Sequence, residues 1–303
     1  MKTSPTKINV SLCLQRMLLW SSVILYTLCL PYAIFVYRSI VNRFSSQAAG
    51  MVPLYTIIAF ALIYIIVGLL KKKIARCLIV LAVGGIIIIL VMNLEANANK
   101  HIHIPEYILM SWILYLALAA DYSGSGILLL VFICAAMLGV VDEILQGIHL
   151  QRSYGWTDML VDTAASFIGC LTILGLKQPT IGDWRWCKDL RHFKGSLAVI
   201  SFGVITALPM GSLLSNIPDK NSFFKVYPGW LLAGNVLFVT ACLALIAYHW
   251  RRKLTIGKLG PSDKPSAGRN HTTAMLWVIC PMAILMAMHA LVLWVAVAGI
   301  DFA

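Results

Sequence analysis

Charged residues are scarce in this chain. They make up 12% of its 303 residues, whereas hydrophobic residues make up 60% and the mean hydropathy is +0.85. A soluble domain usually carries about 25% charged residues, so this chain has too few to cover a water-facing surface. The alternating segments of about ten residues that build membrane barrels are also missing. Apolar runs of about 20 residues recur instead, each long enough to cross a bilayer as a helix. The composition therefore predicts an all-α integral membrane protein.

Paired cysteines and a cleavable signal are lacking as well. The eight Cys residues are scattered, contain no CxxC pair and lie mostly in apolar runs, where a small hydrophobic role is the simpler interpretation. We therefore expect no disulfide framework, no metal site and no cofactor. The first apolar run, 17–36, is too long for a secretory h-region, and Arg38 stands where a small-residue cleavage site would be. This run is expected to be an uncleaved first span.

Hydropathy predicts a polytopic helical bundle with about nine transmembrane helices. No internal repeat is evident. The chain is expected to contain two N-terminal spans in 1–76, a four-helix membrane domain in 77–176, and a basic loop with three further spans in 177–303. The expected spans are 17–36, 51–70, 77–94, 105–120, 126–148, 157–176, 196–214, 229–249 and 274–299.

The net charge of +12 comes from short Lys and Arg blocks between apolar runs. Such blocks set orientation and contact anionic lipid headgroups, so membrane lipids are the expected partners and nucleic acid is not. With the N-terminus in the cytoplasm, the inner segments carry 18 of the 24 Lys and Arg residues and the outer segments carry 6. This bias predicts a cytoplasmic N-terminus, an external C-terminus and an external position for the connections near residues 95–103 and 150–156.

Ionisable residues gather at these two external connections. A charged group at membrane depth is costly unless it is paired or hydrated, so each one is a candidate functional residue. Helical spacing of three or four residues places several of them on shared faces, and the Arg152 guanidinium is the natural counter-ion for the carboxylates. The candidate polar site consists of His103, Glu106, Tyr107, Glu143, Gln146, Arg152, Asp158 and Asp162.

The segments "HIPEYILMSWILYLAL" and "VVDEILQGIHLQRSYGWTDMLVDTAASFIG" resemble the VanZ-like family of bacterial membrane proteins, over roughly residues 77–176. His103, Glu106 and Tyr107 match the family's first element, and Glu143 with Gln146 match its second. Arg152, Asp158 and Gly169 match the third element. Asp162 stands where the family usually has Asn, and Ala165 where it often has Gly.

The resemblance implies a multi-pass protein of the bacterial cell membrane, in a family named for glycopeptide resistance. We expect an outer-face site that binds or acts on a lipid-linked or cell-envelope substrate. In an enzyme, Glu143 or Asp158 would be the general base and Arg152 the anion binder. The alternatives are a non-catalytic accessory subunit of an envelope complex, with other membrane subunits as partners, and a transporter.

Plainer interpretations stay open for the same residues. The polar site is alternatively a clasp that fixes helix packing, and His103 an interfacial residue in contact with water. Asp142 lies about 100° around the helix from Glu143, which favours a solvated position at headgroup level. The segment 182–195 is either an amphipathic helix on anionic lipid or a basic loop with interfacial aromatic residues. His249 and His289 are expected to be structural.

Overall fold

The computed structural model describes residues 10–149, 152, 154–216, 227–256, 265–300 and 302, except residue 96. Within these ranges the protein is helical and contains no strand. The α-helices are α1 (Val10–Cys29), α2 (Ala33–Arg43), α3 (Ser46–Leu70), α4 (Ile74–Leu94), α5 (His103–Ala119), α6 (Ile127–Ile148), α7 (Trp156–Leu176), α8 (Lys194–Leu214), α10 (Gly229–Ile256) and α11 (Pro265–Ala298). Short 3-10 helices are η1 (Leu30–Tyr32), η2 (Ala98–Ile102) and η3 (Arg185–Phe193).

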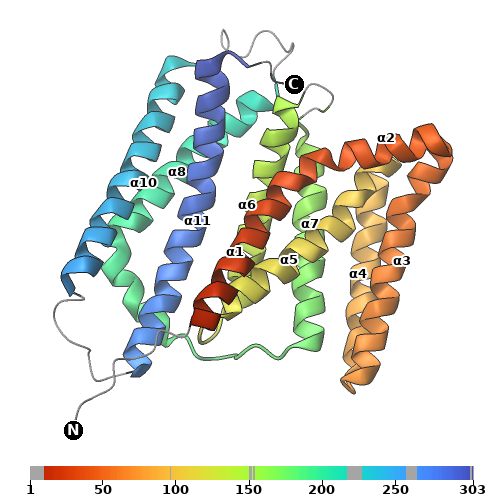
Figure 1. Cartoon of the computed structure of the whole chain (residues 1–303), viewed down its shortest axis with the longest axis horizontal. Helices are drawn as coiled ribbons and strands as arrows, with labels where there is room; N and C mark the ends of the chain where they lie inside the picture. Colours follow the sequence, from red (N-terminus) through yellow and green to blue (C-terminus); the bar gives the residue numbers. More distant parts are fainter. Residues whose placement is uncertain are drawn as a thin grey trace.

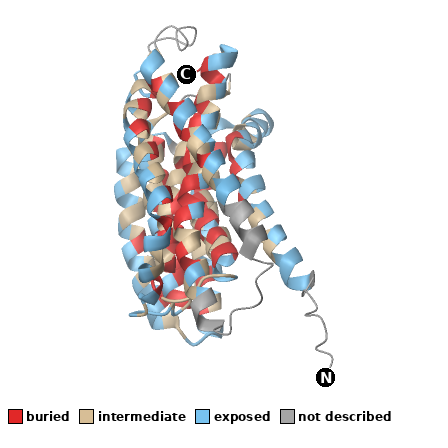
Figure 2. Ribbon diagram, turned by 90° about the vertical axis from the view of Figure 1, so that its left-hand side faces the viewer, coloured by how far each residue is buried: buried red, intermediate tan, exposed pale blue. Residues whose placement is uncertain are grey.

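Nine helical segments of the described chain are long and apolar enough to cross a membrane. This confirms the prediction of an all-α, multi-pass membrane protein. Exposed leucine and isoleucine side chains, such as Ile63, Ile66 and Leu90, cover its flanks, as expected for surfaces that contact lipid. Figure 2 shows the buried residues concentrated along the middle of the bundle and the exposed ones on its flanks.

Successive spans run in opposite directions, so the connections fall at two ends (Figure 1). We call the end that holds η2 and the α6–α7 connection the site end. The end of α11 lies there too, and Phe302 packs on Tyr154 with a ring-centroid separation of 5.8 Å. The opposite end holds the α3–α4 turn and η3.

The first apolar run is bent, unlike the single straight span 17–36 that hydropathy predicts. α1 ends at Cys29, and Pro31 lies in the following 3-10 turn, where its ring fixes φ and its missing N–H breaks the helical ladder. In Figure 1, α2 then runs across the site end. The next helix, α3, begins at Ser46. Ser45 caps it, because the Ser45 side chain accepts a hydrogen bond from the Ala48 N–H (3.0 Å).

The centre of the bundle is formed by α5, α6 and α7. In the most apolar 18-residue stretch of each of these three spans, at least half of the residues are buried (50%, 61% and 61%), against 17% in α3 and in α4. α11 also reaches 50%. Small residues bring α5 and α7 together: a Cβ at Gly169 would lie 2.6 Å from the Cβ of Ser111. Ala165 and Ser166, about one turn before Gly169, are also buried. The site end of these three helices carries the candidate residues.

The C-terminal helices α8, α10 and α11 pack on one another, and α11 packs against α6. His289 is fully buried there and its ring nitrogens contact the Thr206 hydroxyl (2.9 Å) and the Leu285 carbonyl (2.9 Å), which agrees with a structural role. The side chain of His249 lies outside the described residues. α10 continues to Ile256 and α11 begins at Pro265, so both helices extend beyond the expected spans 229–249 and 274–299. Residues 257–264 are not described.

The basic aromatic segment docks on the protein through its aromatic side chains. Trp186 in η3 is buried, stacks on Trp277 of α11 with 5.1 Å between ring centroids, and donates from Nε1 to the Ser125 carbonyl (2.9 Å). Arg185 is exposed and pairs with Asp183 (2.9 Å). η3 is therefore an integral part of the fold on the side opposite to the site end.

Candidate functional site

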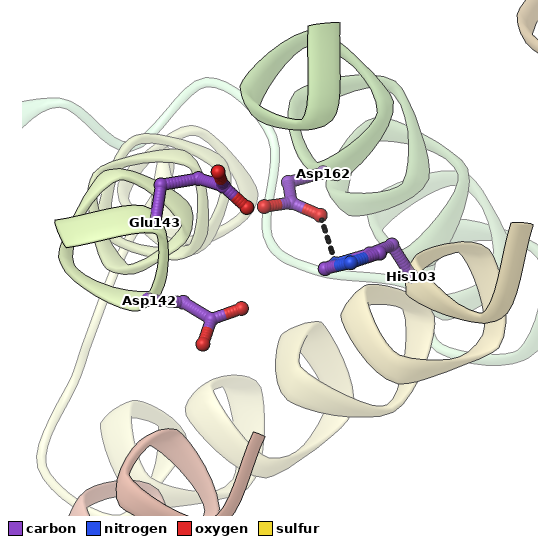
Figure 3. Close-up of side chains that lie close together, drawn as sticks. All are labelled: His103, Asp142, Glu143 and Asp162. Atoms are coloured by element: carbon purple, nitrogen blue, oxygen red, sulfur yellow. Dashed lines mark ion pairs between the residues drawn. The ribbon is translucent and has the colours of Figure 1, made fainter. Parts of the chain in front are cut away.

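Four ionisable side chains converge between α5, α6 and α7 near the site end. His103 begins α5, Asp142 and Glu143 lie in the last turns of α6, and Asp162 lies in the second turn of α7. Each offers one nitrogen or oxygen atom such that all four atoms lie within 4.8 Å of one another. All four residues are buried, and Figure 3 shows their side chains directed toward a common space. We call this group the four-residue centre.

His103 is placed by the start of α5. Pro105 occupies the first turn, where its missing N–H costs no helical hydrogen bond, and the imidazole points toward α7. His103 Nδ1 lies 3.0 Å from Asp162 Oδ1, and the ring stacks on Tyr107 with 6.4 Å between centroids. Only 3% of the His103 side chain is exposed, so the expectation of a water-facing interfacial residue is wrong.

Asp142 belongs to the centre, which overturns its predicted solvated position. Its Oδ2 accepts hydrogen bonds from Gln146 Nε2 (2.9 Å) and from the Tyr107 hydroxyl (3.4 Å). The prediction failed because α6 is enclosed by protein on several sides. Two adjacent helix positions can then both be interior, even though about 100° separates them.

Glu143 is held by the connection that follows its own helix. Its Oε2 accepts a hydrogen bond from the Gly155 N–H (2.9 Å), just before α7 begins. Glu106 lies at the edge of the group, with Oε2 3.9 Å from His103 Nδ1 and 16% of its side chain exposed. The structure thus brings five of the predicted residues around one point: His103, Glu106, Tyr107, Glu143 and Asp162.

Arg152 lies beside the centre, but it binds a different partner from the one expected. Its Nε donates to Gln146 Oε1 (2.9 Å), its Nη2 contacts the same oxygen, and Nη2 is 3.5 Å from His103 Nε2. Among the described residues no carboxylate forms an ion pair with Arg152. The predicted role as counter-ion to the carboxylates is therefore not what the structure displays. The guanidinium keeps a positive charge beside the centre.

The counter-ion of Asp158 is Lys100, which sequence reasoning missed. Lys100 Nζ lies 2.9 Å from Asp158 Oδ1 and 3.4 Å from Glu95 Oε2. Glu95 also accepts from the Thr157 hydroxyl (3.1 Å) and the Asn97 N–H (3.0 Å). We call Glu95, Lys100, Thr157 and Asp158 the clamp. Glu95 and Lys100 lie in the polar stretch between the apolar runs 77–94 and 105–120, and this position is the signal that could have identified them.

Partial burial pushes the pKa of Glu95 up, but the Asn97 N–H, the Lys100 ammonium and the Thr157 hydroxyl outweigh it, so the pKa of Glu95 lies below its ordinary value. Burial and the neighbouring Glu143 carboxylate raise the pKa of Tyr154 to about 12. Tyr154 therefore stays a neutral phenol beside the α6–α7 connection.

Several buried oxygens of the centre have no hydrogen-bond partner among the described residues. They are Oδ1 of Asp142, Oε1 of Glu143 and Oδ2 of Asp162, whereas Asp162 Oδ1 and His103 Nδ1 form an ion pair with each other at 3.0 Å. Buried polar atoms are almost always satisfied, so a group of unsatisfied ones calls for a physical reason. The side chains that carry these atoms are the ones that face one another across the centre.

Comparisons with protein-family models, with curated proteins and with solved structures found no match to the chain.

Proposed function

We propose that this chain is a VanZ-like protein of the bacterial cell membrane that binds a lipid-linked, anionic envelope substrate at the outer boundary of the bilayer and acts on its polar end. The observation that carries the proposal is the convergence, at one end of α5, α6 and α7, of the residues that carry the resemblance. His103, Gln146 and Arg152 come from the first, second and third motifs, yet the Arg152 guanidinium contacts both Gln146 and His103.

The positive-inside bias supports an external position for this site. The segments on the same side of the membrane as the site end carry few Lys and Arg residues, and the opposite segments carry most of them. An envelope substrate is the class of molecule that such a site would meet.

An amphipathic substrate suits the depth of the site. Asp162 lies six residues into α7 and therefore about 9 Å from the helix end. If headgroups surround that end, Asp162 would lie below them. Near the site end, α2 presents Phe35 to His149, with 5.5 Å between ring centroids. A lipid tail anchored in the bilayer would hold the attached polar group beside these helix ends.

Arg152 is the residue suited to bind an anionic group on the substrate. Its guanidinium is already positioned by a neutral amide, Gln146, and so retains its charge for a phosphate or carboxylate. Glu143 is the better candidate for a general base than Asp158, because Asp158 is paired with Lys100 whereas Glu143 keeps one oxygen without a protein partner.

Binding is tested with purified protein in neutral detergent micelles and a polyprenyl phosphate as probe, with the uncharged polyprenol for comparison. We expect the phosphate to bind and Arg152→Ala to weaken binding about 10- to 100-fold, because a charge-assisted hydrogen bond contributes about 1.5–3 kcal/mol. Arg185→Ala is the matched control, since Arg185 is an exposed arginine at the opposite end. Equal binding of phosphate and polyprenol, or equal loss in both variants, would sink the proposal.

Orientation is tested separately by labelling intact cells with an impermeant thiol reagent. In a background without the native cysteines, Asn97→Cys reports on the site end and Ile181→Cys on the opposite end, and both positions are exposed. We expect labelling at position 97 without permeabilisation and at position 181 only after it. The reverse result would place the site in the cytoplasm and exclude an envelope substrate.

A further inference from the structure

We propose that His103, Asp142, Glu143 and Asp162 form a binding site for one divalent transition-metal ion, of the Mn²⁺ or Zn²⁺ class. The inference deepens the proposed function by giving the anionic substrate a cation to bind, and its mechanistic role rests on that function. Metal binding itself can be measured without any substrate.

The distances suit an ion. Opposite ligands of an octahedral ion with bonds of about 2.1 Å are about 4.2 Å apart, and adjacent ligands about 3.0 Å. The four candidate atoms lie within 4.8 Å of one another, and His103 Nδ1 and Asp162 Oδ1 are 3.0 Å apart. Two atoms at the upper limit of 4.8 Å are about 0.6 Å farther apart than opposite ligands, so a movement of a few tenths of an ångström by each side chain would bring such a pair to bonding distance.

The charge balance also calls for a cation. Three carboxylates and one imidazole share a space in which all four residues are 2% exposed or less. Burying ionised carboxylates without a partner is costly, so such groups are paired, protonated or bound to metal. Lys100 binds Asp158 and Glu95, and Arg152 binds the Gln146 amide. A protonated His103 would balance one carboxylate, that of Asp162, and leave those of Asp142 and Glu143 without a cation.

The hydrogen bonds around the centre hold the carboxylates in the way that outer-shell partners hold metal ligands. Gln146 binds Oδ2 of Asp142 and leaves Oδ1 without a partner, and Gly155 binds Oε2 of Glu143 and leaves Oε1 without one. Each carboxylate thus keeps one buried oxygen available to coordinate an ion. These buried, unpartnered oxygens distinguish the centre from an ordinary acidic cluster.

The ligand types select the class of ion. Carboxylates with an imidazole suit Mn²⁺, Fe²⁺ or Zn²⁺, whereas Ca²⁺ and Mg²⁺ take oxygen ligands and Cu⁺ prefers thiolates. The ligands come from three helices. His103 lies 39 residues before Asp142, and Asp162 lies 19 residues after Glu143, so no motif of closely spaced Cys and His residues marks the site in the sequence. An ion held here would lie next to Arg152, and the two positive charges together would favour an anionic group on the substrate.

The experiment measures metal content and melting temperature of the purified protein, before and after chelation, with Mn²⁺ and Zn²⁺ as the probes. We expect about one ion per chain, a fall in melting temperature on chelation and its recovery on adding back the ion. His103→Gln and Asp162→Asn should each lower the affinity by about 10-fold or more. His289→Gln is the matched control, because it also removes a buried imidazole but lies far from the centre in the C-terminal helices.

The inference is overturned if monodisperse wild-type protein binds neither ion stoichiometrically and shows no change in melting temperature, or if the His103→Gln protein binds as tightly as the His289→Gln protein. Should Asp162→Asn fail to fold, Glu143→Gln provides the same comparison. Metal binding without polyprenyl phosphate binding would leave this inference standing and reject the proposed function. If the protein binds polyprenyl phosphate without containing metal, and added metal does not change that binding, this inference is rejected and the proposed function stands.

Discussion

The ammonium of Lys100 lies 2.9 Å from the carboxylate of Asp158, and this ion pair joins the segment before α5 to the first turn of α7. Glu95 binds the same ammonium from the other side at 3.4 Å. The clamp therefore fastens the ends of three helices, α4, α5 and α7, next to the four-residue centre. Loss of the clamp should therefore loosen the helix ends that position the four-residue centre.

Removing one member of this pair should cost more than removing both. Lys100→Met leaves the buried Asp158 carboxylate without its cation, whereas the Lys100→Met/Asp158→Asn protein has no unpaired charge. Because 30% of the Lys100 side chain is exposed, we expect a coupling of about 1–3 kcal/mol, below the value for a fully buried pair. A double-mutant cycle by thermal unfolding in detergent measures it. Additive effects would show that the pair contributes nothing specific.

The clamp should also respond to acid through Glu95. The pKa of Glu95 is lowered in the folded protein from its ordinary value of 4.5, so its contribution to stability is fully present above that value and is lost as the pH falls through the lowered pKa. Wild-type protein should melt at a higher temperature than Glu95→Gln at about pH 7, and the difference should shrink below about pH 4.5. A difference that grows with acidification contradicts the assigned partners.

Close packing of α5 on α7 gives a third prediction. A Cβ at Gly169 would lie 2.6 Å from both side-chain atoms of Ser111 and 3.2 Å from the backbone of Ile108, so Gly169→Ala must push the two helices apart. We expect destabilisation of about 1–3 kcal/mol. Gly85→Ala is the control, because a Cβ there meets nothing within 4 Å and alanine favours the helix by about 1 kcal/mol. Equal melting temperatures for the two variants would exclude this contact as a determinant of packing.

The sequence predicted more of the fold than of the site. Runs of apolar residues located all nine spans, because hydrocarbon demands continuous helices of nearly fixed length. The bend at Pro31 was not foreseen, since hydropathy does not register a change of direction inside an apolar run.

Side-chain partners depended on how helices sit around one another, which spacing along one helix does not reveal. Asp158 and Asp162 share a helix face, yet one binds Lys100 and the other faces His103. The 100° separation from Glu143 predicts a solvated Asp142, whereas Asp142 is buried in the four-residue centre. In both cases the neighbours of a helix are set by tertiary packing, which spacing along that helix does not record.

The aromatic anchor of η3 gives the last prediction, and it separates the two interpretations that the sequence left open for the basic segment. Trp186 is 3% exposed and is held by Trp277 and the Ser125 carbonyl, whereas Trp184 is 47% exposed. If η3 is part of the folded core, Trp186→Ala should destabilise the protein by about 3 kcal/mol or more, because it empties a packed site and leaves the Tyr122 hydroxyl as the remaining donor to the Ser125 carbonyl. Trp184→Ala should cost less, and melting temperatures in detergent without anionic lipid provide the comparison. If instead the segment acts mainly by binding anionic lipid, both variants would melt like the wild type in neutral detergent and differ from it only when anionic lipid is added.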